Sequence, residues 1–212
     1  MEYLSIKNLN NIQNNNLPDE SYTSILNNFP RLTLNFVPWP GYPYKPLTQF
    51  SITHNERCIY LRFYVTEKAI RAVNTTINSS VWEDSCVEFF IAFDDTGYYN
   101  LECNCIGTAL LGYGKDKYNR NLLPVKTVAK IKTHAVIIEQ TTGGISWELA
   151  IAIPVEVFIH HQIESLRGKE CSANFFKCGD LLPEPHFLAW NNILYPEPNF
   201  HLPEFFGKLH FE

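Results

Sequence analysis

The sequence predicts an all-β fold: an antiparallel two-sheet β-sandwich of immunoglobulin-like or jelly-roll type, with one or two short helices. Three observations support this prediction. Several segments alternate apolar and polar residues with a period of two, as half-buried strands do. Aromatic residues, which are common in strands, make up 14% of the chain. Thirteen Pro and 10 Gly interrupt the chain often, which favours strands joined by turns over a helical bundle.

The chain of 212 residues is 45% hydrophobic and 18% charged, so it has enough apolar side chains to bury a core. We find no internal repeat and no break in composition after residue 30, which predicts a single domain over residues 1–212. Residues 8–28 are rich in Asn and poor in apolar side chains. We therefore expect residues 1–34 to be a loosely ordered leading segment.

Charge and hydropathy exclude several classes of protein. Seventeen Lys and Arg stand against 22 Asp and Glu, a net charge of -5, so the basic surface of a nucleic-acid-binding protein is missing. No apolar run is long enough to span a membrane. The first residues lack a basic stretch followed by an apolar one, which predicts a cytoplasmic location. It also favours mostly reduced, buried thiols over a disulfide framework for the six cysteines. The sequence does not predict an oligomeric state.

The alternating segments define the strands that we expect. In the clearest one, Ile59–Val65, Ile59 and its alternate neighbours are apolar on one face. The expected strands are 59–65, 86–93, 98–105, 125–140, 144–153, 171–177, 187–193 and 207–211. Short helices are expected at 67–73 and 155–162, and the proline-rich stretch 36–46 should run extended.

Polar residues gather on one face of the strands 86–93 and 98–105. Glu88 lies opposite the apolar residues of the first strand, and Asn100 and Glu102 do so in the second. If these strands pair, Glu88 and Glu102 are near neighbours, since paired strands lie about 4.8 Å apart. The face is then either an ordinary solvated sheet surface or a platform for a hydroxyl-rich ligand. Trp82, in the segment that leads into the first strand, favours the platform, because an indole face packs against the C–H face of a sugar.

Several motifs in order resemble carbohydrate-binding module family 9 and its relatives in the DOMON-like sandwich superfamily. The resemblance covers about residues 35–212. It rests on the runs Val81-Trp82-Glu83-Asp84-Ser85-Cys86-Val87-Glu88-Phe89-Phe90-Ile91, Tyr98-Tyr99-Asn100-Leu101-Glu102-Cys103-Asn104-Cys105-Ile106-Gly107, Ala173-Asn174-Phe175-Phe176-Lys177-Cys178-Gly179-Asp180, Trp190, and Asn199-Phe200-His201-Leu202-Pro203-Glu204-Phe205-Phe206-Gly207-Lys208-Leu209.

The resemblance implies a β-sandwich that binds a mono- or oligosaccharide, at a terminal sugar unit, without cleaving it. Two tryptophans would clamp the sugar and polar side chains would bind its hydroxyls. Carried over by motif position, the sugar-binding residues are Trp82, Glu88, Trp190, Glu102, Asn100, Lys177 and Asn174. The sequence departs from the sugar-binding modules after Asn104, where no arginine follows in residues 105–108.

The resemblance also implies a calcium ion, for which Asp94 and Asp95 are the candidate ligands. A turn with two aspartates is also common without any metal. No other cofactor is expected. Trp190 has an alternative interpretation as a core residue. Trp147 is expected in the core, and Trp39 is expected to pack under the N-terminal segment.

Other functions remain open at this stage. A glycoside hydrolase would use Glu88 and Glu102 as its carboxylate pair, since retaining enzymes hold such groups about 5 to 5.5 Å apart. A haem module would need axial ligands, and Met1 is the chain's single methionine. A degenerate module that has kept the sandwich and mediates protein contacts is the remaining alternative.

Overall fold

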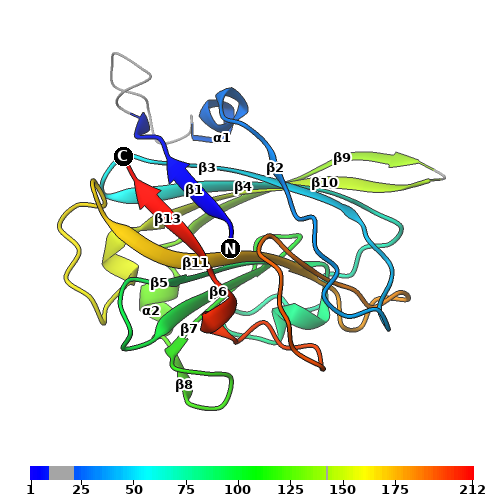
Figure 1. Cartoon of the computed structure of the whole chain (residues 1–212). Helices are drawn as coiled ribbons and strands as arrows, with labels where there is room; N and C mark the ends of the chain where they lie inside the picture. The colour runs from blue at the N-terminus through cyan, green and yellow to red at the C-terminus, as the bar shows by residue number, and fades with distance from the viewer. Residues whose placement is uncertain (10–21, 142) are drawn as a thin grey trace.

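The computed structural model describes residues 1–9, 22–141 and 143–212 as two stacked β-sheets (Figure 1). Sheet A has the strand order β1-β13-β11-β5-β6-β7-β8, with β12 paired to β11, and sheet B has the order β2-β3-β4-β10-β9. The strands of sheet A are β1 (Tyr3–Ile6), β5 (Cys86–Ala92), β6 (Tyr98–Asn104), β7 (Ala109–Gly114), β8 (Arg120–Leu122), β11 (Glu170–Cys178), β12 (Phe187–Ala189) and β13 (Gly207–Phe211). Those of sheet B are β2 (Leu32–Thr33), β3 (Leu47–His54), β4 (Cys58–Glu67), β9 (Lys132–Thr141) and β10 (Gly144–Pro154).

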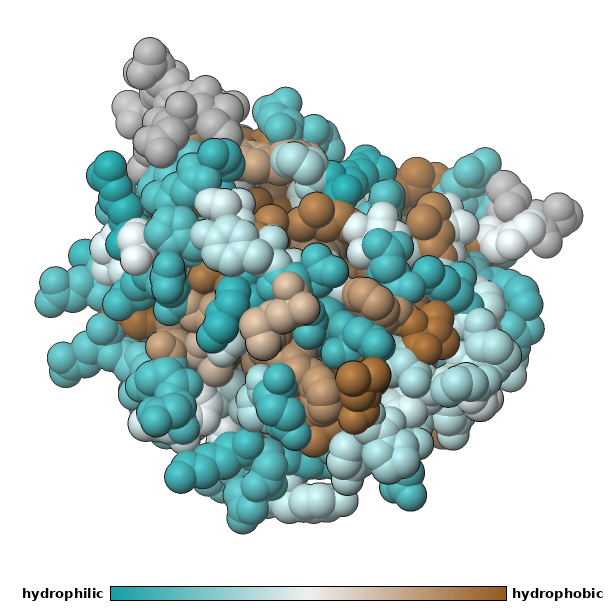
Figure 2. Space-filling view, in the orientation of Figure 1, coloured by the Kyte–Doolittle hydropathy of each residue, from teal (hydrophilic) through white to brown (hydrophobic). Residues whose placement is uncertain are grey.

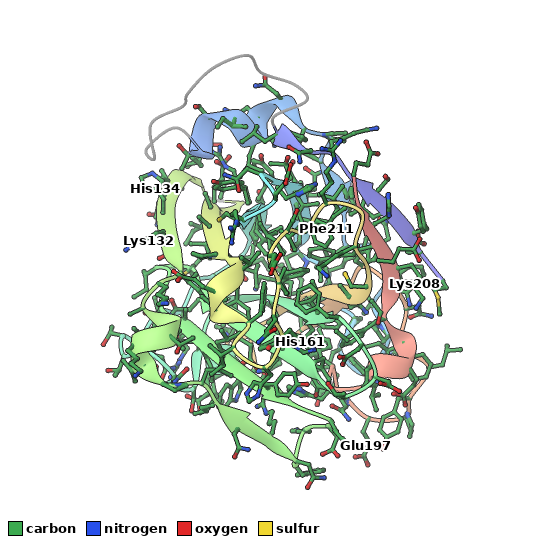
Figure 3. The ribbon with its side chains drawn as sticks, turned by 90° about the vertical axis from the view of Figure 1, so that its left-hand side faces the viewer. Lys132, His134, His161, Glu197, Lys208 and Phe211 are labelled. Carbon is green, nitrogen blue, oxygen red and sulfur yellow. The ribbon has the colours of Figure 1, made fainter. Side chains whose placement is uncertain are left out.

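The predicted β-sandwich is therefore confirmed, and the paired strands of the described residues run antiparallel except at one edge of sheet A. There β1 runs parallel to β13, with Tyr3 opposite Lys208, so segments from the two ends of the chain lie side by side (Figure 1). In the side view of Figure 3, Lys132 and His134 of β9 lie at one side of the molecule and Lys208 at the other.

Apolar side chains of both sheets meet in a core between them. Phe50 of β3 stacks on Phe175 of β11 with ring centroids 3.9 Å apart. Phe89 of β5 stacks on the same ring at 4.9 Å. Trp147 of β10 is fully buried there, as expected. The period-two alternation of the sequence places these residues on the inner faces, because successive side chains of a strand point to opposite sides.

The outer face of sheet A is covered too, so the solvated sheet surface, one of the two alternatives that the sequence left open, does not apply to β5 and β6. Every residue of β5 and β6 is buried. The cover is a second apolar cluster, to which Trp39 and residues of the segment 190–206 contribute. Its buried members are Trp39, Val81, Cys86, Phe90, Ala92, Tyr98, Leu110, Phe176, Cys178, Ala189, Ile193, Phe200 and Phe206. A strand covered on both faces loses the solvent exposure that alternation alone suggests.

The leading segment is ordered wherever the structure describes it, so the expectation of a loose segment over 1–34 is wrong for those residues. β1 lies within sheet A, and α1 (Tyr22–Ile25) and the 3₁₀ turn η3 (Leu26–Asn28) follow the undescribed residues. Leu9, Ile25 and Phe29 form a small buried cluster against Tyr60. Residues 10–21 lie outside the described residues.

The expected helices fall elsewhere in the chain. No helix forms over 67–73, where β4 ends at Glu67 and irregular chain follows. The segment expected as a helix at 155–162 has only the 3₁₀ turn η5 (Val155–Val157). Conversely, α2 (Val125–Val128) occupies the start of the strand expected over 125–140, and β9 begins at Lys132.

Hydrophilic side chains cover most of the face shown in Figure 2, and apolar residues reach the surface in separate patches. None of the described helices is both long and apolar enough to cross a membrane.

Candidate functional site

The pairing of β5 with β6 brings two carboxylates together on the outer face of sheet A. Glu88 lies directly opposite Glu102 in the register of the two strands, as the sequence predicted for paired strands. Their side chains are buried, with residue exposures of 3% and 2%. Directly opposite side chains have Cβ atoms about 4.5 to 5.5 Å apart, so the two carboxyl groups act on the same small volume.

Trp82 lies beside these carboxylates on the 3₁₀ turn η4 (Val81–Glu83). Its carbonyl oxygen accepts a hydrogen bond from the backbone N–H of Asp180 at 3.2 Å. The turn is also held by Asp84, whose buried carboxylate pairs with Arg71 and accepts the side-chain N–H of Asn104. Burial by itself raises the pKa of Asp84, but these bonds lower it below its usual value. Asp84 thus fixes the loop that presents Trp82.

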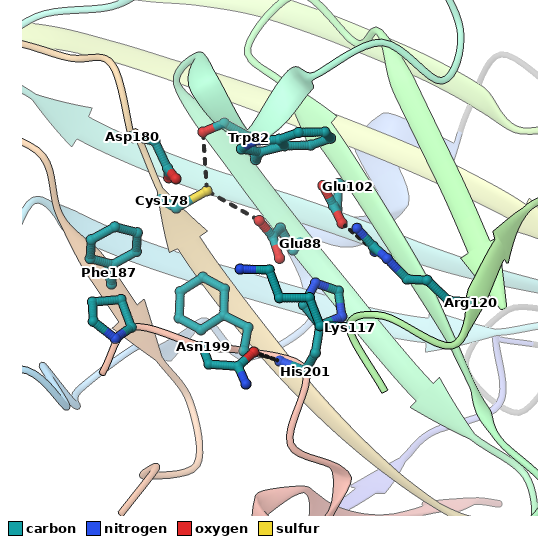
Figure 4. Close-up of a pocket in the computed structure, with 12 residues that line it drawn as sticks. Trp82, Glu88, Glu102, Lys117, Arg120, Cys178, Asp180, Phe187, Asn199 and His201 are labelled. Carbon is teal, nitrogen blue, oxygen red and sulfur yellow. Dashed lines mark hydrogen bonds and ion pairs between the residues drawn. The ribbon is translucent and has the colours of Figure 1, made fainter. Parts of the chain in front are cut away.

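A pocket of about 170 Å³ opens between this turn and the segment 190–206, here called the covering segment because it lies over the outer face of sheet A. Figure 4 shows the Trp82 ring along one side, with Glu88 and Glu102 close by and Phe187 across the opening. Twelve residues line it: Trp82, Glu88, Glu102, Lys117, Arg120, Cys178, Asp180, Phe187, Pro198, Asn199, Phe200 and His201. Aromatic walls with a few converging polar groups are typical of small-molecule sites.

Burial controls the protonation of the carboxyl groups in this pocket. Burial, followed by the charge of Glu102, raises the pKa of Glu88 well above its usual range. Burial raises the pKa of Glu102 as well, although Arg120 opposes this effect. Burial likewise raises the pKa of Asp180 to about 6. Two neighbouring buried carboxyl groups disfavour double ionisation, so the pair can both donate and accept hydrogen bonds.

Cationic residues reach the same pocket from the hairpin that joins β7 to β8. Arg120 Nη1 lies 3.3 Å from Glu102 Oε1, and Lys117 is a further lining residue. Burial, together with the positive charges of Arg120 and Lys117, lowers the pKa of His201 to about 3. His201 is therefore neutral at physiological pH and offers its ring as a hydrogen-bonding group without charge.

Arg120 and Lys117 are pocket-lining residues that sequence reasoning missed, since it searched for an arginine directly after Asn104. The signal that could have found Arg120 is the pattern of glycines on β7. Gly112 and Gly114 lie on the outer face of β7, opposite Asn100 of β6 and Arg120 of β8 respectively. At these two positions the outer face of β7 carries no side chain, whereas Leu110 on the same face belongs to the covering apolar cluster. A Cβ at Gly112 would lie 2.6 Å from Asn100 Oδ1.

Asn100 was predicted to contact the ligand, but the structure places it beneath Glu102. Its Nδ2 donates to Glu102 Oε1 at 2.9 Å, and the residue is fully buried. Asn100 does not line the pocket. It orients the Glu102 carboxyl group.

Three other predicted residues lie away from the pocket. Trp190 is 6% exposed and packs edge-on against Phe50 and Phe175 in the core. The side chain of Lys177 on β11 points toward the inter-sheet core. Its Nζ binds Glu67 Oε2 at 2.9 Å, and both side chains are buried. The predicted roles of Trp190 and Lys177 are thus corrected, because their side chains point between the sheets.

The side chain of Asn174 points to the outer face of β11, but it contacts the covering segment instead of the pocket. Its Nδ2 donates to the carbonyl oxygen of Asn191 at 2.9 Å, and its Oδ1 accepts the backbone N–H of Asn191. It is fully buried. The predicted contact of Asn174 with a ligand is corrected for this reason.

The wall opposite Trp82 consists of Phe187 and Phe200 in place of the second tryptophan. Trp39 supports both rings, with centroids 5.9 Å from Phe187 and 5.7 Å from Phe200. Its Nε1 donates to the carbonyl oxygen of Tyr195 at 2.9 Å. The sequence predicted that Trp39 packs under the N-terminal segment. In the structure it packs under the pocket wall instead.

Asp94 and Asp95, the candidate calcium ligands, lie at the turn between β5 and β6, outside this pocket. Asp94 Oδ1 accepts the backbone N–H of Thr96 at 2.8 Å, and Asp94 Oδ2 lies 3.2 Å from His161 Nε2. Hydrogen bonds from Thr96 lower the pKa of Asp94. In the described part of the chain, neither aspartate belongs to a group of three or more potential metal ligands, so calcium at this turn stays a prediction.

Comparison with known proteins identifies the family and the fold. The family model described as "Carbohydrate-binding family 9" matches residues 22–211. None of the curated proteins matches the chain significantly. A crystal structure of a candidate carbohydrate-binding protein from Bacteroides uniformis is 40% identical, with a TM-score of 0.91, over 100% of this chain and 99% of that one.

Two further solved structures are more distant. They are of a carbohydrate-binding module of family 9 from Caldicellulosiruptor kristjanssonii, in complex with glucose and with cellotriose. Each is 12% identical, with a TM-score of 0.61 over 100% of this chain. The match covers 96% of the glucose-bound chain and 94% of the cellotriose-bound chain. At this identity the likeness concerns the fold.

Proposed function

The chain belongs to carbohydrate-binding family 9, and on this premise we propose that its pocket binds a terminal unit of a mono- or oligosaccharide without cleaving it. The observation that carries the proposal is the half-exposed indole of Trp82 beside the buried pair Glu88 and Glu102. An aromatic face takes the C–H face of a sugar ring, while carboxyl groups bind its hydroxyls.

The remaining lining residues have complementary roles in this proposal. Arg120, Lys117 and Asn199 supply hydrogen-bond donors, and Phe187 and Phe200 supply the apolar wall across from Trp82. Family 9 structures solved with glucose and cellotriose support a gluco-configured ligand. Hydrogen bonds that replace water contribute little net free energy. We therefore expect dissociation constants in the range of about 1 μM to 1 mM.

Calorimetric titration of the purified chain with glucose and cellotriose tests this function. Tryptophan fluorescence provides a second readout, because Trp82 is the least buried of the four tryptophans. Sugar should change the emission of the wild type but not of Trp82→Phe. Titrations with and without calcium would show whether a cation contributes. Absence of heat and of any fluorescence change across a panel of glycans would contradict the proposal and favour a module for protein contacts.

A glycoside hydrolase is the second candidate function, and one observation favours it. Glu88 and Glu102 lie opposite each other on the adjacent strands β5 and β6, and burial raises the pKa of both. A general acid requires a carboxyl group with such a raised pKa. Measuring reducing sugar released from oligosaccharides during the same titrations separates the two functions. Release that disappears in Glu88→Gln would establish the hydrolase, and binding without release would establish the binding module.

A further inference from the structure

Two thiols and a carboxyl group converge at one end of the pocket. Cys86 and Glu88 are two residues apart on β5, so both project from its outer face. Cys178 of β11 lies directly opposite Cys86 in the strand register. One ligand atom from each residue lies within 4.8 Å of the others. Among residues 1–9, 22–141 and 143–212, this is the single group of three or more such ligands.

The spacing of these atoms fits one metal ion. Zinc binds thiolate sulfur at about 2.3 Å and carboxylate oxygen at about 2.0–2.2 Å, so sulfur and oxygen ligands of a tetrahedral site lie about 3.6 Å apart. The observed separations from Glu88 Oε1 are 3.1 Å to Cys178 Sγ and 4.0 Å to Cys86 Sγ. The two values bracket the expected one, so small side-chain rotations suffice.

We propose that Cys86, Cys178 and Glu88 form a binding site for a thiophilic divalent cation such as Zn²⁺ at the inner end of the pocket. Thiolate ligands select zinc over calcium and magnesium, which prefer oxygen. Asp180, whose carboxyl group interacts with the Cys178 thiol, lines the same pocket. Because all three ligands come from paired strands of one sheet, the site is preformed.

Binding at this site exchanges protons for the cation. Burial raises the pKa of Cys86 to about 12 and that of Cys178 well above its usual value, so both thiols are protonated in the free protein. A cation takes both sulfurs as thiolates and Glu88 as a carboxylate, and the protons that these three groups hold pass to the solvent. Affinity therefore rises with pH.

Absorption titration of the full chain under reducing conditions, first with Co²⁺ and then with Zn²⁺, tests the site. Cobalt should give a sulfur-to-metal charge-transfer band that saturates at one ion per chain, and zinc should abolish it. Cys86→Ala and Cys178→Ala should weaken binding by at least about 100-fold, since even outer partners of metal ligands contribute 10–100-fold. Cys171→Ala is the matched control, because Cys171 lies on the same strand but faces the inter-sheet core.

Three outcomes would overturn the proposal. The first is the absence of a charge-transfer band in the wild type, and the second is an unchanged band in both Cys86→Ala and Cys178→Ala. The third is a loss of metal affinity in Cys171→Ala equal to that in these two variants. Should a cysteine variant fail to fold, Glu88→Gln provides the test. It keeps both sulfurs and loses one ligand, so it should retain the band while zinc affinity falls by about 10-fold or more.

A second readout rests on the proposed function. A cation bound to Glu88 removes an acceptor for sugar hydroxyls, so Zn²⁺ should lower the sugar affinity of the wild type and not that of Cys178→Ala. The two proposals fail separately. A cobalt band without sugar binding would contradict only the sugar pocket, and sugar binding without a cobalt band would contradict only the cation site.

Discussion

The pocket on sheet A and the polar cluster between the sheets both combine carboxyl groups with cationic side chains, but only the pocket is open to solvent. In the inner cluster, Lys177 Nζ binds Glu67 Oε2 at 2.9 Å and His186 Nε2 at 2.8 Å. Trp147 Nε1 donates to Glu67 Oε1 at 2.7 Å. Glu67, Lys177 and His186 are almost fully buried, so the inner cluster has no surface on which a ligand could bind.

The two clusters differ because neighbouring residues of the same strand point to opposite sides of the sheet. On β11, Lys177 faces the inter-sheet core and Cys178 faces the pocket. A shift of one residue moves a side chain to the other side of a sheet. Residue type alone therefore does not separate a binding residue from a structural one. The comparison predicts that inner-cluster variants change stability and pocket variants change affinity.

The largest expected effect is that of Lys177→Met on stability. Removing Lys177 leaves the buried Glu67 without its cationic partner and should lower the free energy of unfolding by about 3–5 kcal/mol. Urea denaturation measures this loss. The double variant Lys177→Met with Glu67→Gln should recover part of it. Unchanged stability together with weaker sugar binding would show that Lys177 belongs to the binding site after all.

Trp190→Phe should also act on stability, to a smaller extent. The smaller ring leaves space beside Phe50 and Phe175 in the core, which should cost about 1–3 kcal/mol. Thermal unfolding monitors the loss, and calorimetry with sugar should give the wild-type affinity. A variant of normal stability with weakened sugar binding would restore Trp190 to the pocket.

Arg120→Gln should act chiefly on affinity, with a smaller loss of stability than Lys177→Met, because Arg120 pairs with Glu102 beside the open pocket. Removing a donor to a charged or sugar oxygen should weaken sugar binding by about tenfold, which corresponds to about 1.4 kcal/mol. Lys115→Gln is the matched control, since Lys115 is exposed on the same hairpin but does not line the pocket. Equal effects of the two substitutions would point to general electrostatics instead of a specific contact.

A further effect concerns the pH dependence of stability through Asp180. Its pKa of about 6 in the fold, raised by burial, exceeds the ordinary value of 3.8. The folded protein therefore favours the protonated form, and this contribution to stability is present below about pH 4 and is lost as the pH rises through about 6. Relative to Asp180→Asn, the wild type should lose at most about 1.4 kcal/mol per pH unit across this window. Parallel urea midpoints for the two proteins would refute the shift.

Sequence reasoning succeeded where local alternation decides the structure. Glu88 and Glu102 were placed side by side because both strands alternate strictly and follow each other in the chain. β3 was missed for the opposite reason. Its buried positions include Thr48, Ser51 and Thr53, so polar residues conceal the pattern of a strand covered on both faces.

The remainder of the site depends on tertiary contacts that local patterns do not encode. Phe200 and Asn199 reach the pocket from an irregular covering segment without strand or helix periodicity. Arg120 reaches Glu102 from β8, two strands away, across a face kept clear by glycines. Trp190 was misplaced because β12 has only three residues, too few to establish which side chains face the core.

The sugar affinity of Trp82→Ala, measured by calorimetry beside its melting temperature, tests the central claim most directly. A ligand stacked on Trp82 loses the aromatic contact, about 0.5–1.5 kcal/mol, in addition to the buried apolar area. The variant should therefore bind at least about tenfold more weakly and melt within a few degrees of the wild type. Wild-type affinity in a folded Trp82→Ala protein would contradict the account.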